Sequence, residues 1–189
     1  MVGRELAQGK PDMDALKEFI ADFSQESDRA AVIVGAAKLD LVLFQVLQRV
    51  LAPCTSSVDD LLENSGGLST FSSRIHLVYR LGLIDDHYAR ALHLVRKIRN
   101  TFAHEAAKGS LDQPPHRDRI RELAAPFLPY DRFNQDAATM AGSGIASKQF
   151  RHVLAIMIAR LEQLLVSSVQ CHPAISQTLV PPHWDAPTK

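Results

Sequence analysis

The chain has 189 residues and a mass of 20.9 kDa, which predicts one domain of ordinary size. Its hydrophobic fraction of 46% and charged fraction of 22% are close to globular averages and exclude a wholly disordered chain. The 21 Lys and Arg residues balance the 21 Asp and Glu residues, so the net charge is zero. This balance argues against a protein that coats nucleic acid through bulk charge.

The two cysteines, Cys54 and Cys171, lie far apart and form no CxxC motif, which excludes a Cys-rich zinc site and a disulfide framework. Residues 1–5 lack the apolar core of a signal peptide. The longest apolar stretch, residues 30–47, contains two charged side chains and is too polar to span a bilayer comfortably. We therefore expect a soluble cytoplasmic protein with reduced thiols and no membrane contact.

Helical periodicity dominates the first third of the chain. Apolar residues at helical spacing between positions 16 and 23 predict a short helix. Ser27 is a suitable N-cap for a long helix that runs to about Leu51, and Pro53 ends it. Residues 57–62 predict a further short helix.

Two helices follow in the middle of the chain. Thr70 is suited to cap the first, and Gly82 is its expected C-terminal stop. Asp85 or Asp86 starts the second, which runs to about Ala107. The first of these helices is expected to carry Phe71, Ile75, Val78 and Tyr79.

The remainder of the chain is less regular. Residues 109–145 contain one predicted short helix, near residues 118–123, and a last strong helix is expected over residues 147–169. We found no segment that favours a strand over a helix. The sequence therefore predicts an all-α helical bundle, a single domain over residues 1–170, and an extended proline-rich tail over residues 171–189.

Charge is concentrated in the middle of the chain. Residues 1–73 have a net charge of −5, whereas residues 74–108 have a net charge of +4 and hold four of the eight histidines. This basic segment is either a functional surface or a solvated face that pairs with the acidic N-terminal helices.

The helix after Gly82 separates into two faces on a helical wheel. The apolar stripe consists of Ala91, Leu94, Val95, Ile98 and Phe102. The opposite polar face consists of His93, Arg96, Asn100, Ala103 and His104, with Arg99 on its flank. It combines a permanent cation, an amide and a titratable imidazole.

These polar residues fit a phosphate site that needs no metal. Arg99 is suited to bind a phosphodiester bidentately, His104 to move a proton near neutral pH, and Asn100 to orient the imidazole or bind a phosphate oxygen. From spacing alone a structural role is the commoner outcome. In that alternative Arg99 pairs with an acid on the long helix, such as Asp28 or Asp40, while the other two residues cap backbone groups.

Residues 99–104, Arg-Asn-Thr-Phe-Ala-His, resemble the Arg-polar-x-x-x-His signature of the HEPN superfamily of all-α bundles. A larger ordered set of blocks resembles one branch of it, the mannitol operon repressor family. The blocks are residues 27–29, 59–62, 68–75, 81–84 and 98–104, and the resemblance covers about residues 12–170. The segment 109–145 and the tail match no motif.

The resemblance implies two different activities. The repressor family implies a transcriptional regulator of a sugar-alcohol operon. The superfamily implies, in many members, a metal-independent endoribonuclease whose Arg and His meet in a dimer cleft and use the RNA 2′-hydroxyl. Carried onto this chain, the nuclease residues are Arg99, Asn100 and His104. Arg29 and Arg74 match other family blocks, and we expect them to buttress the bundle rather than to line the cleft.

Direct readout of DNA is poorly supported, because no short turn joins two helices of which the second is an exposed basic recognition helix. The nearest candidate turn, residues 81–84, is followed by a helix with a strong apolar face. A regulator that acts through a protein partner fits the zero net charge better.

Our leading expectation is thus a homodimeric transcriptional regulator without metal or cofactor. Its expected binding residues are Arg29, Arg74, Arg96, Arg99, Asn100 and His104. The dimer is expected to use the face around Arg96, Asn100 and His104. A metal-independent ribonuclease is the alternative, a non-catalytic interaction module is the third possibility, and contact with RNA or DNA is left open.

Overall fold

The computed structural model describes residues 13–62, 66–104 and 109–172 of the chain. Within these ranges it contains seven helices and no strand, which confirms the predicted all-α bundle. The helices are α1 (Met13–Gln25), α2 (Asp28–Val50), α3 (Phe71–Arg80), α4 (Asp86–His104), α5 (His116–Ala124), α6 (Asp131–Thr139) and α7 (Ile145–Ser167).

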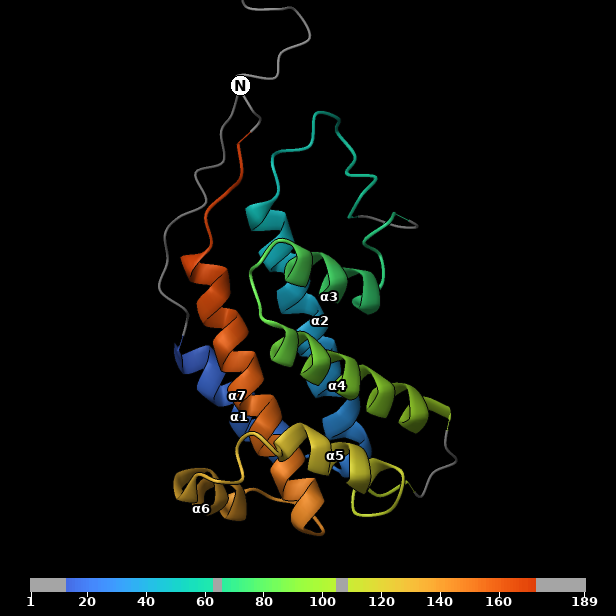
Figure 1. Cartoon of the computed structure of the whole chain (residues 1–189), viewed down its shortest axis with the longest axis vertical. Helices are drawn as coiled ribbons and strands as arrows, with labels where there is room; N and C mark the ends of the chain where they lie inside the picture. Colours follow the sequence, from blue (N-terminus) through green and yellow to red (C-terminus); the bar gives the residue numbers. More distant parts are fainter. Residues whose placement is uncertain (1–12, 63–65, 105–108, 173–189) are drawn as a thin grey trace, which may run out of the picture.

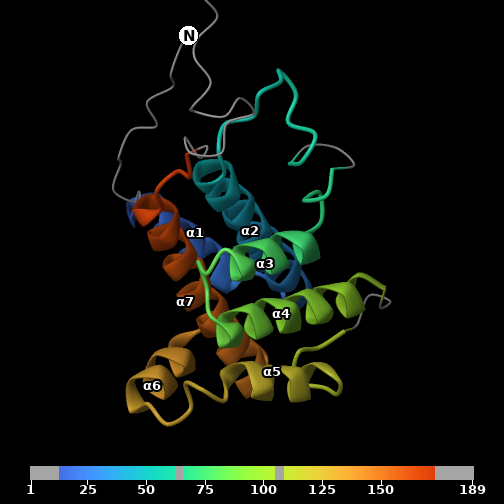
Figure 2. The same ribbon diagram turned by 45° about the horizontal axis from the view of Figure 1, so that its top comes forward.

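Helices α2 and α7 lie side by side at the centre of the bundle (Figure 1). α4 packs against α2, and α3 packs against both α2 and α4. The short helices α5 and α6 pack against α7, and α6 lies at the end of the molecule remote from α3 (Figures 1 and 2). α1 contacts α2 and α7. The arrangement leaves the outer side of α3 and α4 as one face of the molecule.

Helix α2 is the core of the fold. By length and composition alone it is apolar enough to cross a membrane, a property it shares with core helices of other proteins. Here it contacts α1, α3, α4 and α7. Its apolar side chains include five that are buried, namely Val32, Leu39, Leu43, Val46 and Val50. We therefore interpret its hydrophobicity as that of a central helix.

The predicted helix boundaries rest on hydrogen-bonded caps. The side chain of Ser27 accepts a hydrogen bond from the backbone N–H of Ala30. Thr70 and Ser73 form a reciprocal capping box at the start of α3. Gly82 adopts a φ of 69° just after α3, where a residue with a side chain would be strained. These caps fix where α2 and α3 begin and where the chain turns into α4.

The predicted short helix over residues 57–62 is wrong. These residues form turns, and the Asp59 carboxylate accepts hydrogen bonds from the backbone N–H groups of Leu61 and Leu62. This local side-chain pairing offers the backbone an alternative to helix.

The predicted helix near residues 118–123 is confirmed as α5, but α6 was missed within the segment expected to be irregular. Only two residues of α6, Phe133 and Ala137, are buried, so its sequence periodicity is weak. The Phe133 ring packs 5.0 Å from the ring of His152 on α7, measured between centroids. Packing on α7, rather than local propensity, stabilises so short a helix.

Two expectations fall outside the described residues. The C-terminal end of α4 was expected near Ala107, and the structure describes the helix to His104. The proline-rich tail lies beyond His172.

Candidate functional site on helices α3 and α4

Helix α4 places its two faces as the wheel predicts. Leu94, Val95, Ile98 and Phe102 are buried, whereas Arg99, Asn100, Ala103 and His104 are exposed. His93 and Arg96 are half-buried. We call His93, Arg96, Arg99, Asn100, Ala103 and His104 the polar face of α4. Its members come from one helix, so the fold brings them together without any long-range arrangement.

Arg99 does not make the ion pairs that the structural alternative required. Asp40 is bound by Arg74, with Nη1 2.7 Å from Oδ1, and Asp28 is bound by Arg151, with Nη1 3.0 Å from Oδ1. Within the described part of the chain, the side chains of Arg99, Asn100 and His104 make no hydrogen bond or ion pair. These three groups remain open to solvent or to a ligand.

Arg74 is placed very differently. Its Nε donates to the carbonyl of Leu68 at 2.8 Å, and its guanidinium lies 4.9 Å from the centre of the Phe44 ring. With the Asp40 pair, these contacts tie the start of α3 and the preceding loop to α2. A part for Arg74 in ligand binding stays a prediction. The same holds for Arg29, which is exposed in the first turn of α2.

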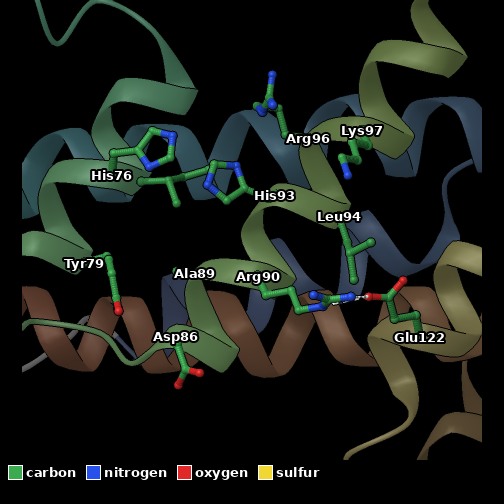
Figure 3. Close-up of a pocket in the computed structure, with 11 residues that line it drawn as sticks. His76, Tyr79, Asp86, Ala89, Arg90, His93, Leu94, Arg96, Lys97 and Glu122 are labelled. Atoms are coloured by element: carbon green, nitrogen blue, oxygen red, sulfur yellow. Dashed lines mark hydrogen bonds and ion pairs between the residues drawn. The ribbon is translucent and has the colours of Figure 1, made fainter.

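A surface pocket of about 610 Å³, which we call the α3–α4 pocket, lies between α3, α4 and the side of α5 (Figure 3). Its lining residues are Ile75, His76, Tyr79, Asp86, Ala89, Arg90, His93, Leu94, Arg96, Lys97 and Glu122. It therefore takes in His93 and Arg96 of the polar face.

Two histidines meet in this pocket. The rings of His76 on α3 and His93 on α4 lie 4.8 Å apart, measured between centroids (Figure 3). Burial lowers the pKa of His93 below its ordinary value, and the nearby His76, Arg96 and Lys97 lower it further. The Nε of Arg96 is buried and has no hydrogen-bond partner among the described residues. The pocket thus places the His93 imidazole beside Arg96 and Lys97, two cations that make no ion pair with a described residue.

One side of the α3–α4 pocket is closed by an ion pair. The Nε of Arg90 donates to Oε1 of Glu122 at 2.7 Å, which joins α4 to α5 (Figure 3). Both residues are exposed, so this pair contributes little to stability. The pair leaves Arg90, one of the cations that line the pocket, already bound to a carboxylate.

A second pocket, of about 480 Å³, lies on the other flank of the polar face and is called here the Arg99 pocket. It is lined by Ala36, Ala37, Asp40, Leu41, Phe44, Leu62, Phe71, Arg74 and Arg99. Most of these side chains are apolar, and the charge of Asp40 is already paired with Arg74. Arg99 is therefore the one unpaired charge among the residues that line this pocket.

The described residues contain no group of three His, Cys, Asp or Glu side chains that would hold a metal ion. Sequence reasoning singled out the polar face but missed His76 and Tyr79 on α3 and Glu122 on α5 as its neighbours. No local spacing marks these residues, since they meet α4 only through the packing of separate helices.

Comparison with known proteins identifies the family. The family model described as mannitol repressor (MtlR) matches residues 29–168. A solved structure, the MtlR–HPr complex from Escherichia coli, has a similar fold, with a TM-score of 0.52 and 16% sequence identity. The match covers 80% of this chain and 99% of that chain. Among curated proteins, none matches this chain. The family match spans most of the sequence, and the chain belongs to the mannitol repressor family.

Proposed function

We propose that this chain is a cytoplasmic transcriptional regulator that acts by binding a protein partner. The observation that carries the proposal is the family match over residues 29–168. The similar fold of a protein solved in complex with HPr supports HPr as the partner. The target proposed from the family name is a sugar-alcohol operon.

The placement of α4 supports partner binding over direct base readout. A recognition helix needs an exposed face that fits into the major groove. Helix α4 follows a turn at Gly82 but lies against α2, α3 and α5, with its apolar side chains in the core. The net charge of zero gives no general attraction to nucleic acid.

The Arg99 pocket is the surface we propose for the partner. Its apolar lining continues to Leu41, whose side chain is 49% exposed, and Arg99 stands unpaired among these residues. Arginine beside exposed apolar side chains is typical of the centre of protein interfaces. A homodimer through the adjacent residues Arg96, Asn100 and His104 remains part of the proposal.

Titration calorimetry of the full chain with purified HPr tests the proposal. We expect saturable binding that Arg99→Glu and Leu41→Glu each weaken at least tenfold. Lys17→Glu is the matched control, because Lys17 is exposed on α1, which does not pack against α3 or α4. Failure of the folded protein to bind HPr would remove this partner. Binding that is equal in all variants would remove the Arg99 pocket as its site.

A metal-independent ribonuclease is the second candidate, and one observation favours it. Arg99, Asn100 and His104 are exposed on one side of α4 and have no hydrogen-bond or ion-pair partner among the described residues. This is the arrangement a nuclease of the HEPN type needs. RNA cleavage in EDTA, with cyclic-phosphate ends, would support it if both His104→Ala and Arg99→Ala abolish the activity while remaining folded. Absence of cleavage on several RNAs would exclude the ribonuclease and leave the regulator as the proposed function.

A further inference from the structure

The α3–α4 pocket has one strongly cationic end. Within the described chain, Arg96 and Lys97 make no ion pair, and the buried Nε of Arg96 has no hydrogen-bond partner. The paired rings of His76 and His93 lie beside them. Burying a polar donor without a partner is unfavourable, and a bound anion would remove that cost. Two cations and two imidazoles together are suited to a phosphate group.

The opposite end of the same pocket has a different chemistry. Figure 3 shows the Tyr79 hydroxyl and the Asp86 carboxylate away from Arg96 and Lys97. Neither side chain makes a hydrogen bond to another described residue. Carboxylate oxygens accept hydrogen bonds, and a phenol both donates and accepts, so this end suits hydroxyl groups. Asp86 precedes His93 by seven helical residues, which separates the two ends by roughly 10 Å along α4.

We propose that the α3–α4 pocket binds a phosphomonoester of a small polyhydroxylated molecule, of the sugar phosphate or sugar-alcohol phosphate class. The phosphate lies at the end formed by His76, His93, Arg96 and Lys97. The hydroxyl groups extend along α4 toward Tyr79 and Asp86. The volume of about 610 Å³ is in the range of small-molecule sites.

The charges of the lining select this class of ligand over a nucleic-acid strand. Asp86 places on the pocket wall a carboxylate that has no partner among the described residues, and it would repel a chain of successive phosphates. A ligand with one charged end and one neutral hydroxylated end avoids that repulsion. The inference goes beyond partner binding, because it concerns a different pocket from the one lined by Arg99.

Binding should depend on pH. The ring of His76 on α3 contacts His93, and Arg96 and Lys97 on α4 act on its charge. The other titratable and charged groups that line the pocket are Tyr79 on α3, Asp86 and Arg90 on α4, and Glu122 on α5. A bound phosphate dianion favours the protonated imidazole, so ligand binding should raise the pKa of His93. Affinity is then higher at pH 6.5 than at pH 8. His93 ring resonances in NMR spectra report this change directly.

The test is titration calorimetry of the full chain with sorbitol 6-phosphate, sorbitol and inorganic phosphate. We expect sorbitol 6-phosphate to bind at least tenfold more tightly than either of the others. Arg96→Gln and His93→Gln should weaken it at least tenfold, and Asp86→Asn should weaken it without changing the affinity for phosphate. Lys17→Gln is the matched control and should bind normally, because Lys17 is exposed on α1, which does not pack against α3 or α4.

Lys97→Gln provides a second test, since Lys97 is exposed and its replacement does not disturb the core. Equal affinity for phosphate and sorbitol 6-phosphate would overturn the ligand class. Undetectable binding, or binding that folded His93, Arg96 and Lys97 variants retain, would overturn the site. These outcomes are independent of HPr, so failure here and failure of the proposed partner binding are read separately.

Discussion

Two regions of the bundle hold their arginines in opposite environments, one buried and paired and the other exposed. Between α2 and α7, Arg151 is 1% exposed and lies 3.0 Å from Asp28, while its Nη2 donates to the carbonyl of Glu26 at 2.7 Å. Ser147 also donates to Asp28, and together these residues form the Asp28–Arg151 cluster. On the polar face of α4, by contrast, Arg99 is exposed and makes no such contact with any described residue.

The difference separates structural charges from available ones. Burial alone would raise the pKa of Asp28, but hydrogen bonds from Ser147, the Leu111 N–H and Arg151, with the charge of Arg151, hold it below its ordinary value. That carboxylate is therefore ionised and engaged inside the protein. Arg96 and Arg99 on the polar face of α4 make no ion pair with a described residue, so their interaction energy is left for a ligand or a partner.

The largest expected effect comes from breaking the buried cluster. Arg151→Met leaves the Asp28 carboxylate half-buried without its cation, which should lower the free energy of unfolding by about 3–5 kcal/mol. Urea denaturation followed by circular dichroism measures it. The double variant Arg151→Met with Asp28→Asn should recover part of the loss, because no uncompensated charge then remains. A single-variant loss below about 1 kcal/mol would contradict a structural role for the cluster.

Arg74 should give an intermediate effect. Replacing it with Ala removes its ion pair with Asp40, its hydrogen bond to Leu68 and its packing on Phe44, at a cost of about 2 kcal/mol. Arg74→Lys keeps the charge but loses the planar contacts and should recover less than half of that. Denaturation of both variants checks this, and an unchanged stability for Arg74→Ala would refute its assignment to the structural charges.

The helix caps and the charge pairs differ in how far they could be predicted from the sequence. The caps at Ser27 and Thr70, the stop at Gly82 and the two faces of α4 follow from local rules and are confirmed. The partners of charged residues do not follow, because they depend on how helices cross. The structural alternative paired Arg99 with an acid such as Asp28 or Asp40, yet packing pairs these acids with Arg151 and Arg74.

The candidate site also has one part that could be predicted from the sequence and one part that could not. The polar face of α4 was predictable because its residues share one helix. The meeting of His76 with His93 was not, since those residues belong to different helices and the ring distance is set by the packing of α3 on α4. Helix α6 was missed because only Phe133 and Ala137 anchor it.

A smaller effect is expected from pH, at the contact of α6 with α7. Burial lowers the pKa of His152, against an opposing effect of Asp136. The unfolded chain therefore binds a proton at a higher pH than the folded chain, so stability falls as the pH drops below about 6.5. The wild type should lose more stability than His152→Gln between pH 7 and 5.

The smallest expected change in stability is the one that decides what the polar face of α4 does. Arg99→Ala removes an exposed side chain with no hydrogen bond or ion pair in the described structure, so the free energy of unfolding should change by less than about 0.5 kcal/mol. The same variant should lose most of its affinity for HPr, or its RNA cleavage if the protein is a nuclease. A variant that melts early would place Arg99 with Arg74 and Arg151 among the structural charges. Retained stability with lost binding would instead show that α4 keeps this charge open for a partner.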